Sequence, residues 1–334
     1  MSAIDALRPL GRTSLGVSPI GLGLAALGRP GYINVGHGED LGADRSRDAM
    51  ERGAHEVLDA AYGAGIRYFD AARSYGLAET FLSSWLNARS ISPDAVVVGS
   101  KWGYTYTANW QVDAPAHEIK EHSLGRLTRQ LTESRAILGS HLRVYQIHSA
   151  TLDSGALTDS SIIDALARER SCGLTIGLSV SGERQADAIW RALEISRDGE
   201  PVFDTVQATW NLLERGAEPA LAAASDAGRG VIVKEVLANG RLTSRGSRDR
   251  PDHSTILERE AERLGASMDA VAIAFALAQP WATVVLSGAT TVAQIESNIR
   301  AYATGLPLDS LDRLSAMAMS SSEYWRERTA LPWN

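Results

Sequence analysis

The sequence has little cysteine, little excess basic charge and no long apolar run, and each shortage excludes a class of protein. A single cysteine, Cys172, stands among 334 residues, which excludes a disulfide framework and a zinc site built from several cysteines. No run of about 18 apolar residues occurs, so we expect no transmembrane helix. Residues 1–16 also lack the apolar core of a signal peptide. The net charge of −7 argues against nucleic acid as a partner. We therefore expect a cytoplasmic protein with no membrane partner.

What the chain does contain is a regular alternation of apolar runs and helix-length segments. Candidate strands lie at 19–25, 66–70, 95–101, 142–148, 174–180, 202–209, 230–236 and 282–287. Candidate helices lie at 46–63, 78–88, 117–138, 160–171, 182–196, 217–227, 255–264, 268–279 and 291–303. Strands that alternate with helices form parallel sheets, and eight such strands in about 300 residues fit a closed barrel. We predict an (α/β)8 TIM barrel formed by residues 1–334 as a single domain. An N-terminal β-hairpin at 10–19, an irregular loop at 29–46 and a C-terminal tail complete it.

Three consecutive candidate strands end in a titratable residue. They end at Asp70, Lys101 and His148, and Tyr75 follows the first strand in a turn broken by Gly76. Each of these residues alone is most often a cap, a turn or a packing residue, or part of a structural ion pair. In an α/β barrel, however, the carboxyl ends of the strands meet at one face, where the chemistry takes place. The pattern therefore predicts that the four side chains converge on one pocket.

Together these four groups suit proton delivery to a carbonyl oxygen. A free tyrosine has a pKa of about 10, and a neighbouring ammonium, here that of Lys101, favours the phenolate and lowers this pKa. Asp70 can keep the buried lysine charged, and His148 can donate a hydrogen bond to a carbonyl oxygen or relay a proton. The set lacks an electron source, which a hydride from a nicotinamide cofactor supplies.

The segment FDAARSYG with Glu79 after it, the strand that ends in SK, and YQIH resemble the aldo-keto reductases. The resemblance continues through RTSLGVSPIGLG, GVIVKEVLANGRLT and LSGATTVAQIESNI. It implies an (α/β)8 barrel capped below by the hairpin, with Asp70, Tyr75, Lys101 and His148 as a catalytic tetrad. It also implies an NAD(P)-dependent oxidoreductase. Such an enzyme moves a hydride between nicotinamide C4 and an aldehyde or ketone, or the corresponding alcohol or sugar hydroxyl, with the tyrosine as general acid and base.

The same resemblance implies a cofactor site along the strand ends. Ser179 and Gln207 match the positions that hold the nicotinamide carboxamide, whereas Val180 stands where asparagine is usual. Lys234 occupies the place of an aromatic ring that stacks on the nicotinamide, so we expect that surface from elsewhere, with Trp210 as a candidate. The implied cofactor-binding residues are Gly23, Asp70, Ser179, Gln207, Lys234, Val236, Leu237, Gly288, Thr290, Gln294 and Asn298.

The implied cofactor is NADP or NAD. A 2′-phosphate needs a cation, and residues 288–291 supply none, which argues against strict NADP specificity. Arg241, Arg245 or Arg248 in the preceding loop can still reach this place. The small-molecule substrate, a carbonyl compound or a sugar, is not identified further, and the reaction direction and the oligomeric state stay open.

Other interpretations compete with this one. Residues 21–26 fit the dinucleotide motif G-x-G-x-x-A, but the segment that follows, GRPGYINVGHG, cannot form the helix that the motif requires, so we expect these glycines to serve close packing. A cofactor-sensing module of the same fold, as in potassium-channel β subunits, is an alternative function, and a metal-dependent barrel hydrolase is a weaker one.

We expect His37 to be solvated, and the tail SSEYWRERTALPWN either to cover the barrel mouth or to lie along the surface.

Overall fold

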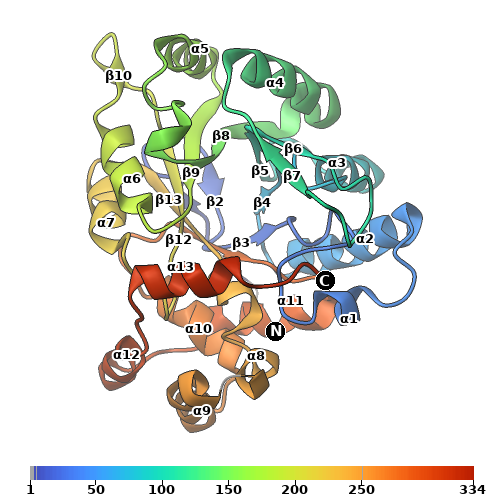
Figure 1. The fold of residues 1–334 in the computed structure, drawn as a ribbon, viewed down its shortest axis with the longest axis vertical. Coiled ribbons are helices and arrows are strands. Elements are labelled where there is room, and N and C mark those ends of the chain that lie inside the picture. The colour runs from blue at the N-terminus through green and yellow to red at the C-terminus, as the bar shows by residue number, and fades with distance from the viewer. Residues whose placement is uncertain (1–3, 5, 250) are drawn as a thin grey trace.

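A closed barrel of eight parallel strands forms the centre of the molecule, as predicted (Figure 1). The computed structural model describes residue 4, residues 6–249 and residues 251–334, without the side chains of residues 248–254. Each barrel strand pairs in parallel with the next, and β14 pairs with β3 to close the ring. The strands, in order around the barrel, are β3 (Ile20–Gly23), β4 (Tyr68–Asp70), β5 (Val97–Trp102), β8 (Leu142–Ala150), β9 (Thr175–Val180), β12 (Thr205–Thr209), β13 (Gly230–Lys234) and β14 (Val284–Ser287).

Helices surround the barrel in the alternation that the sequence predicts. Helix α2 (Arg47–Gly63) is typical: the Ser46 hydroxyl accepts a hydrogen bond from the Ala49 amide at the N-cap, and the apolar residues at helical spacing are buried. The other helices between or after barrel strands are α3 (Ala78–Ala88), α4 (Leu124–Leu138), α5 (Ser160–Ser171), α6 (Gln185–Leu193), α7 (Glu218–Asp226), α8 (Ser244–Asp249), α9 (Pro251–Leu264), α10 (Met268–Leu277) and α11 (Val292–Ile299). Short 3-10 turns lie at Gly139–His141, Leu152–Ser154, Ala238–Gly240 and Arg300–Ala303.

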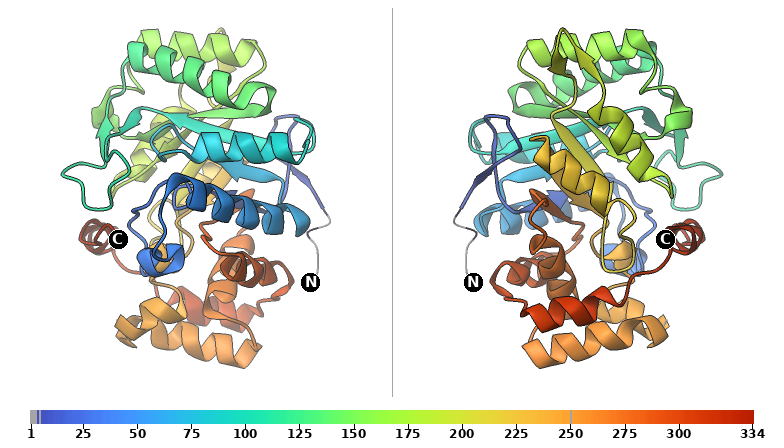
Figure 2. Two further views of the ribbon diagram at one scale, coloured as in Figure 1. Left: turned by 90° about the vertical axis from the view of Figure 1, so that its right-hand side faces the viewer. Right: turned by 90° about the vertical axis from the view of Figure 1, so that its left-hand side faces the viewer.

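The N-terminal hairpin closes one end of the barrel. Its strands are β1 (Arg8–Pro9) and β2 (Gly16–Val17). Leu10, Leu15 and Val17 form one buried cluster with side chains of the barrel strands. In both views of Figure 2 the hairpin and the C-terminus lie at opposite ends of the molecule. The chemistry must therefore use the other end, where the strands finish.

Gly21 of β3 lies where a larger residue would not fit. A Cβ atom there would lie 2.9 Å from Leu286 Cδ2 and from Val284 Cγ1. The residues after β3 form turns rather than a helix. The G-x-G-x-x-A pattern therefore reflects close strand packing, as we expected.

Three local predictions are wrong. The helix predicted at 117–138 begins at residue 124, because Glu118–Lys120 forms strand β7, which pairs with β6 (Tyr104–Tyr106) in an antiparallel ribbon. The loop predicted at 29–46 contains a short helix, α1 (His37–Leu41). A second small ribbon joins β10 (Ser196–Arg197) to β11 (Glu200–Pro201), within and just after a predicted helix.

The C-terminal residues extend over the open end of the barrel. After α12 (Leu308–Ser315), helix α13 (Ser321–Thr329) crosses in front of the barrel in Figure 1, and the chain ends beside α1. The Tyr324 hydroxyl is 3.1 Å from the Asn211 amide nitrogen, just beyond β12. Of the two arrangements considered for the tail, covering the mouth is therefore the one observed. Within the described ranges, no helix is long and apolar enough to cross a membrane.

Candidate active site

Three adjacent strand ends bring the four predicted catalytic side chains together. Asp70 ends β4, Lys101 lies near the end of β5, and His148 lies near the end of β8. The Lys101 ammonium donates to Asp70 Oδ2 and to the Ala71 carbonyl oxygen, the latter at 3.0 Å. The Tyr75 hydroxyl oxygen lies 3.5 Å from Lys101 Nζ and 3.4 Å from His148 Nε2. The four groups thus form one connected cluster.

The turn that carries Tyr75 is fixed by tight backbone contacts. The Leu77 amide donates to the Gly28 carbonyl oxygen at 2.7 Å, and a Cβ atom on Gly28 would lie 2.2 Å from the Tyr75 carbonyl oxygen. Below the turn, the buried Glu79 carboxylate accepts hydrogen bonds from Arg73 and Ser100, each at 2.5 Å. These contacts hold the Tyr75 ring in place, because they attach its turn to the loop after β3 and fix helix α3, which follows it.

The electrostatics of the site differ from our expectation for Tyr75. Burial and the Asp70 carboxylate raise the pKa of Tyr75 well above its usual value, so the expected lowering by Lys101 does not occur. Burial, together with the charges of Lys101 and Lys234, lowers the pKa of His148 well below its usual value. Near neutral pH the site therefore holds a protonated phenol and a neutral imidazole.

Asp70 is a buried hydrogen-bond centre as well as the partner of Lys101. Its Oδ1 accepts from Gln207 Nε2 at 2.9 Å and from Gln146 Nε2 at 3.4 Å. Since Oδ2 accepts from Lys101, both carboxylate oxygens of Asp70 have hydrogen-bond donors.

Arg29 is a central residue that the sequence did not reveal. Its guanidinium is buried, pairs with Glu118 of β7 at 2.5 Å, and lies over the rings of Tyr75, Tyr32 and Trp333 at 5.2, 4.9 and 4.9 Å. It therefore joins the loop after β3, the β6–β7 ribbon and the C-terminal tail around the tyrosine. No pattern in the sequence pointed to this role, because the contacts with Tyr75, Glu118 and Trp333 are distant in sequence.

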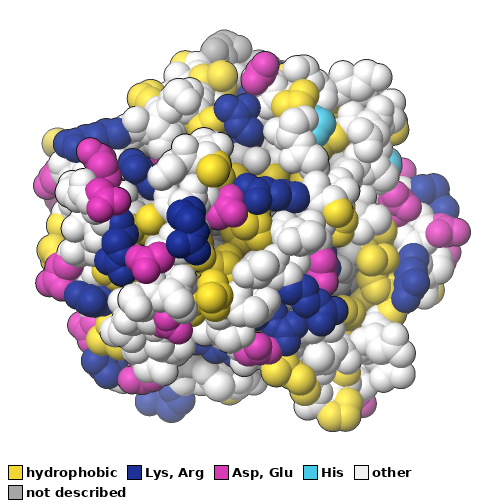
Figure 3. Space-filling model, turned by 90° about the horizontal axis from the view of Figure 1, so that it is seen from above, with side chains coloured by type: hydrophobic (Ala, Val, Ile, Leu, Met, Phe, Trp, Pro, Cys, Tyr) yellow, Lys and Arg dark blue, Asp and Glu magenta, His cyan; other side chains and the backbone are white. Residues whose placement is uncertain are grey.

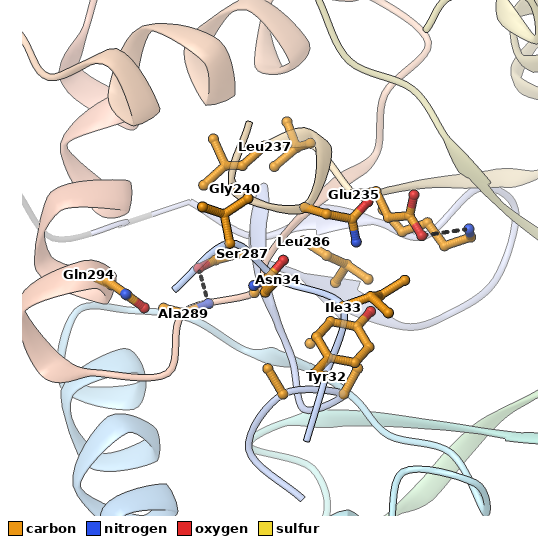
Figure 4. A pocket seen from close by; sticks show the side chains of 18 of the residues that line it. Tyr32, Ile33, Asn34, Glu235, Leu237, Gly240, Leu286, Ser287, Ala289 and Gln294 are labelled. Atoms are coloured by element: carbon orange, nitrogen blue, oxygen red, sulfur yellow. Dashed lines mark hydrogen bonds and ion pairs between the residues drawn. The ribbon is translucent and has the colours of Figure 1, made fainter. Parts of the chain in front are cut away.

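One cavity of about 610 Å³ extends from the tetrad toward α11. In Figure 4, Glu235 and Gln294 lie toward opposite sides of the view, with the loop residues Tyr32, Ile33 and Asn34 facing Leu237 and Gly240. Of the predicted residues, those that line the cavity are Gly23, Asp70, Tyr75, His148, Gln207, Lys234, Val236, Leu237, Gly288, Gln294 and Asn298.

Ser179, Thr290 and Lys101 do not line this cavity. The Ser179 hydroxyl is buried and accepts a hydrogen bond from the Ser149 amide at 2.8 Å, so it orders the end of β8 instead. The amide and the hydroxyl of Thr290 both donate hydrogen bonds to Gln294 Oε1. Lys101 is covered by Asp70 and Tyr75, which do line the cavity.

Other predicted positions also need correction. His37 is buried, not solvated, with its ring edge-on to Tyr32. Trp210 packs against Phe275 and Trp281 inside the protein and does not reach the cavity. Arg241 is held by Glu327, Arg245 does line the cavity, and the side chain of Arg248 lies outside the described residues.

The far end of the cavity carries carboxylates beside the predicted amides. Gln294 Nε2 donates to Asp40 Oδ2, and Asn298 Nδ2 donates to Asp269 Oδ2, each at 2.7 Å. Arg245 is paired with Asp40 at 3.0 Å. A Cβ atom added to Gly288 would meet no atom within 4 Å, so the backbone there is open to a ligand.

These features fit an elongated ligand with one reactive and one polar end, as a nicotinamide dinucleotide has. Asp70, Tyr75 and His148 of the tetrad and the residues Gly288, Gln294 and Asn298 line this one cavity. No group of three or more histidine, cysteine, aspartate or glutamate side chains that could hold a metal ion is found in the part of the chain that the structure describes.

Comparison with known proteins is consistent with this site. The family model described as "Aldo/keto reductase family" matches residues 19–318. "Uncharacterized oxidoreductase YrpG" of Bacillus subtilis is 28% identical over 92% of this chain and 94% of its own. "D-threo-aldose 1-dehydrogenase" of a Pseudomonas species is 26% identical over 86% and 92%. Among solved structures, the holo form of aldo-keto reductase AKR11C1 from Bacillus halodurans superposes with a TM-score of 0.73, at 22% identity over 94% and 97% of the two chains, and shows the same fold. The family match and the names of the relatives support an enzyme of NAD(P)-dependent carbonyl or sugar oxidoreduction in general.

Proposed function

The chain belongs to the aldo/keto reductase family, and from this premise we propose that it reduces an aldehyde or ketone with Tyr75 as the proton donor. The observation that carries the proposal is the position of the Tyr75 hydroxyl, 3.5 Å from Lys101 Nζ and 3.4 Å from His148 Nε2, beside a cavity of about 610 Å³. The reverse reaction, oxidation of an alcohol or sugar hydroxyl, uses the same groups in the opposite order.

Each residue has a distinct task in this proposal. Tyr75 and His148 hold the carbonyl oxygen of the substrate by hydrogen bonds, and Tyr75 transfers its proton as negative charge develops there. The raised pKa of Tyr75 keeps the phenol protonated before the reaction. The Lys101 ammonium, held by Asp70, stabilises the phenolate that remains. When bound, a reduced nicotinamide supplies the hydride.

His148 suits this task because it is neutral. A neutral imidazole has one nitrogen that donates and one that accepts. When the Ser74 hydroxyl, 3.3 Å away, donates to Nδ1, Nε2 carries the proton and can donate to the carbonyl oxygen.

We further propose that the cofactor is NAD(H) in preference to NADP(H). Asp40 and Asp269 contact the amides of Gln294 and Asn298 at the adenosine end, and the cavity-lining cation there, Arg245, is already paired with Asp40. A 2′-phosphate would add two negative charges beside these carboxylates, whereas a ribose hydroxyl can donate a hydrogen bond to a carboxylate.

The decisive experiment is Tyr75→Phe, assayed with a panel of aldehydes, ketones and sugars. We expect turnover to fall by a factor of about 100 or more, while binding of NADH, followed by its fluorescence, is retained. Wild-type turnover in the mutant would refute the role of Tyr75.

The same assay tests the alternative, a cofactor-sensing module of this fold. Such a module binds the nucleotide but does not oxidise bound NADH or NADPH in a single turnover with any carbonyl of the panel. We favour the enzyme because all four tetrad side chains are in contact. A nucleic-acid substrate is not proposed: the face in Figure 3 carries acidic and basic side chains intermixed, without a broad basic patch.

A further inference from the structure

Lys234 is the cation of the cavity whose charge is least compensated. Lysine and arginine side chains that line the cavity, among the described residues, are Arg29, Lys234, Arg245 and Arg328. Each of the three arginines has a carboxylate oxygen within hydrogen-bond distance: Glu118 at 2.5 Å, Asp40 at 3.0 Å and Glu235 at 2.6 Å, respectively. Lys234 has no such partner among these residues.

The Lys234 ammonium instead donates to a neutral group. Its Nζ is 2.7 Å from the Thr209 hydroxyl oxygen, and the nearest carboxylate oxygen, of Glu235, is 3.9 Å away. Glu235 is already bound by Arg328 through contacts to both of its oxygens. Burial lowers the pKa of Lys234 to about 8, as expected for an ammonium with too little counter-charge.

Lys234 lies at the end of the cavity that holds the tetrad. Lys234 ends β13 and Thr209 ends β12, so both lie on the face where the strands end at Asp70 and His148. The positive charge of Lys234 also acts on His148, because it contributes to the lowered pKa of that histidine. Lys101 is matched by Asp70, so the positive charge beside the reacting groups that is least compensated is that of Lys234.

We propose that Lys234 binds an anionic group of the substrate, so that the preferred substrate is an aldehyde or ketone that also carries a carboxylate. This inference deepens the proposed function and rests on it. A carboxylate would complete the coordination of the ammonium, and charge-assisted hydrogen bonds of this kind are the strong ones. The phosphates of the cofactor offer the same chemistry, but the contact with Thr209 keeps the ammonium at the strand ends.

The test compares carbonyl compounds that differ only in charge. For each position of the ring, a carboxybenzaldehyde is paired with the uncharged formylbenzamide of the same shape, and kcat/KM is measured for both. For the wild type we expect, at one ring position, a higher kcat/KM for the carboxybenzaldehyde than for the matching formylbenzamide. In Lys234→Met we expect the ratio of the two kcat/KM values to fall roughly 10- to 100-fold, mainly through KM. Lys234→Arg, which keeps the charge, restores part of the preference.

Two controls separate this inference from its alternatives. Lys120→Met removes a lysine charge outside the cavity and leaves the ratio unchanged. If Lys234→Met weakens NADH binding but leaves the ratio as in the wild type, the ammonium serves the cofactor and the inference is wrong. If the wild type reduces no carbonyl, the proposed function fails. Lys234 is then tested by titrating the wild type and Lys234→Met with benzoate and benzamide, using tryptophan fluorescence, and equal binding of the two ligands overturns the inference.

Discussion

Asp40 is the residue on which the proposed preference for NAD(H) depends most. It belongs to the short helix α1, far in sequence from β14 and α11, yet its carboxylate contacts Gln294 at 2.7 Å, Thr290 at 3.3 Å and Arg245 at 3.0 Å. The carboxylate therefore both adds negative charge at the adenosine end and neutralises the arginine that a 2′-phosphate would use.

We expect Asp40→Asn to shift the cofactor preference toward NADPH. The substitution removes one repulsive charge and releases Arg245 from its ion pair, and both changes favour a phosphate. The ratio of the dissociation constants, Kd for NADPH over Kd for NADH, should fall by about tenfold or more, as measured by fluorescence titration. Asp44→Asn, an exposed carboxylate that follows the same helix, is the matched control and should leave the ratio as it is. An unchanged ratio in Asp40→Asn would mean that the adenosine is bound elsewhere.

At the scale of elements, the loop after β3, the loop after β13 and the C-terminal tail together enclose the cavity. The Val35 amide donates to the Asn239 carbonyl oxygen at 3.0 Å, and Tyr32 and Asn334 exchange backbone hydrogen bonds at 3.1 Å. Helix α13 is attached by the ion pair of Arg328 with Glu235, a residue whose positive φ of 54° is a strained conformation that surrounding contacts must offset. The cavity is therefore covered by three chain segments that meet only in the folded protein.

We expect Arg328→Met to loosen this cover. Removing the guanidinium leaves the Glu235 carboxylate without its closest partner, which should destabilise the fold by about 2 to 4 kcal/mol and increase the dissociation rate of NADH in stopped-flow measurements. Arg326→Met, on the exposed side of the same helix, provides the control and should change neither quantity. Equal dissociation rates in the two variants would show that α13 does not retain the cofactor.

Particular elements show which features the sequence predicted and which it did not. The barrel, its order and the meeting of Asp70, Tyr75, Lys101 and His148 follow from periodic apolar runs that end in titratable residues, which is local information. The β7 strand, the burial of His37, and the roles of Arg29 and Asp40 were not predictable in this way. Strand β7 depends on β6, Arg29 on the C-terminal tail and Asp40 on Gln294, all from other parts of the chain. His37 contacts Tyr32 within the same loop, so its burial depends on how that loop folds as a whole. The assignment of residues 1–334 to a single domain remains a prediction.

At the scale of the whole molecule, buried and half-buried histidines link folding to pH. His37 of α1, His122 before α4 and His148 of β8 come from separate elements, and burial lowers the pKa of each. For His37 and His122 the pKa falls to about 4. In the unfolded chain a histidine has a pKa of about 6.5, so between these values the unfolded state binds more protons than the folded state.

We therefore expect the contribution of these histidines to the free energy of unfolding to be constant above about pH 6.5 and to fall as the pH decreases from there toward 4. Each of these histidines should contribute a loss of about 1.4 kcal/mol per pH unit in that range. Urea unfolding at pH 7.5, 6.5 and 5.5 measures the effect above the range in which most carboxylates titrate. His37→Phe, which keeps a ring against Tyr32 without a titrating group, should reduce the slope by about a third of the total given by the three histidines. A slope that is the same in this variant and in the wild type would mean that His37 is protonated equally in the folded and unfolded states, and that its environment is more polar than the contacts around α1 indicate.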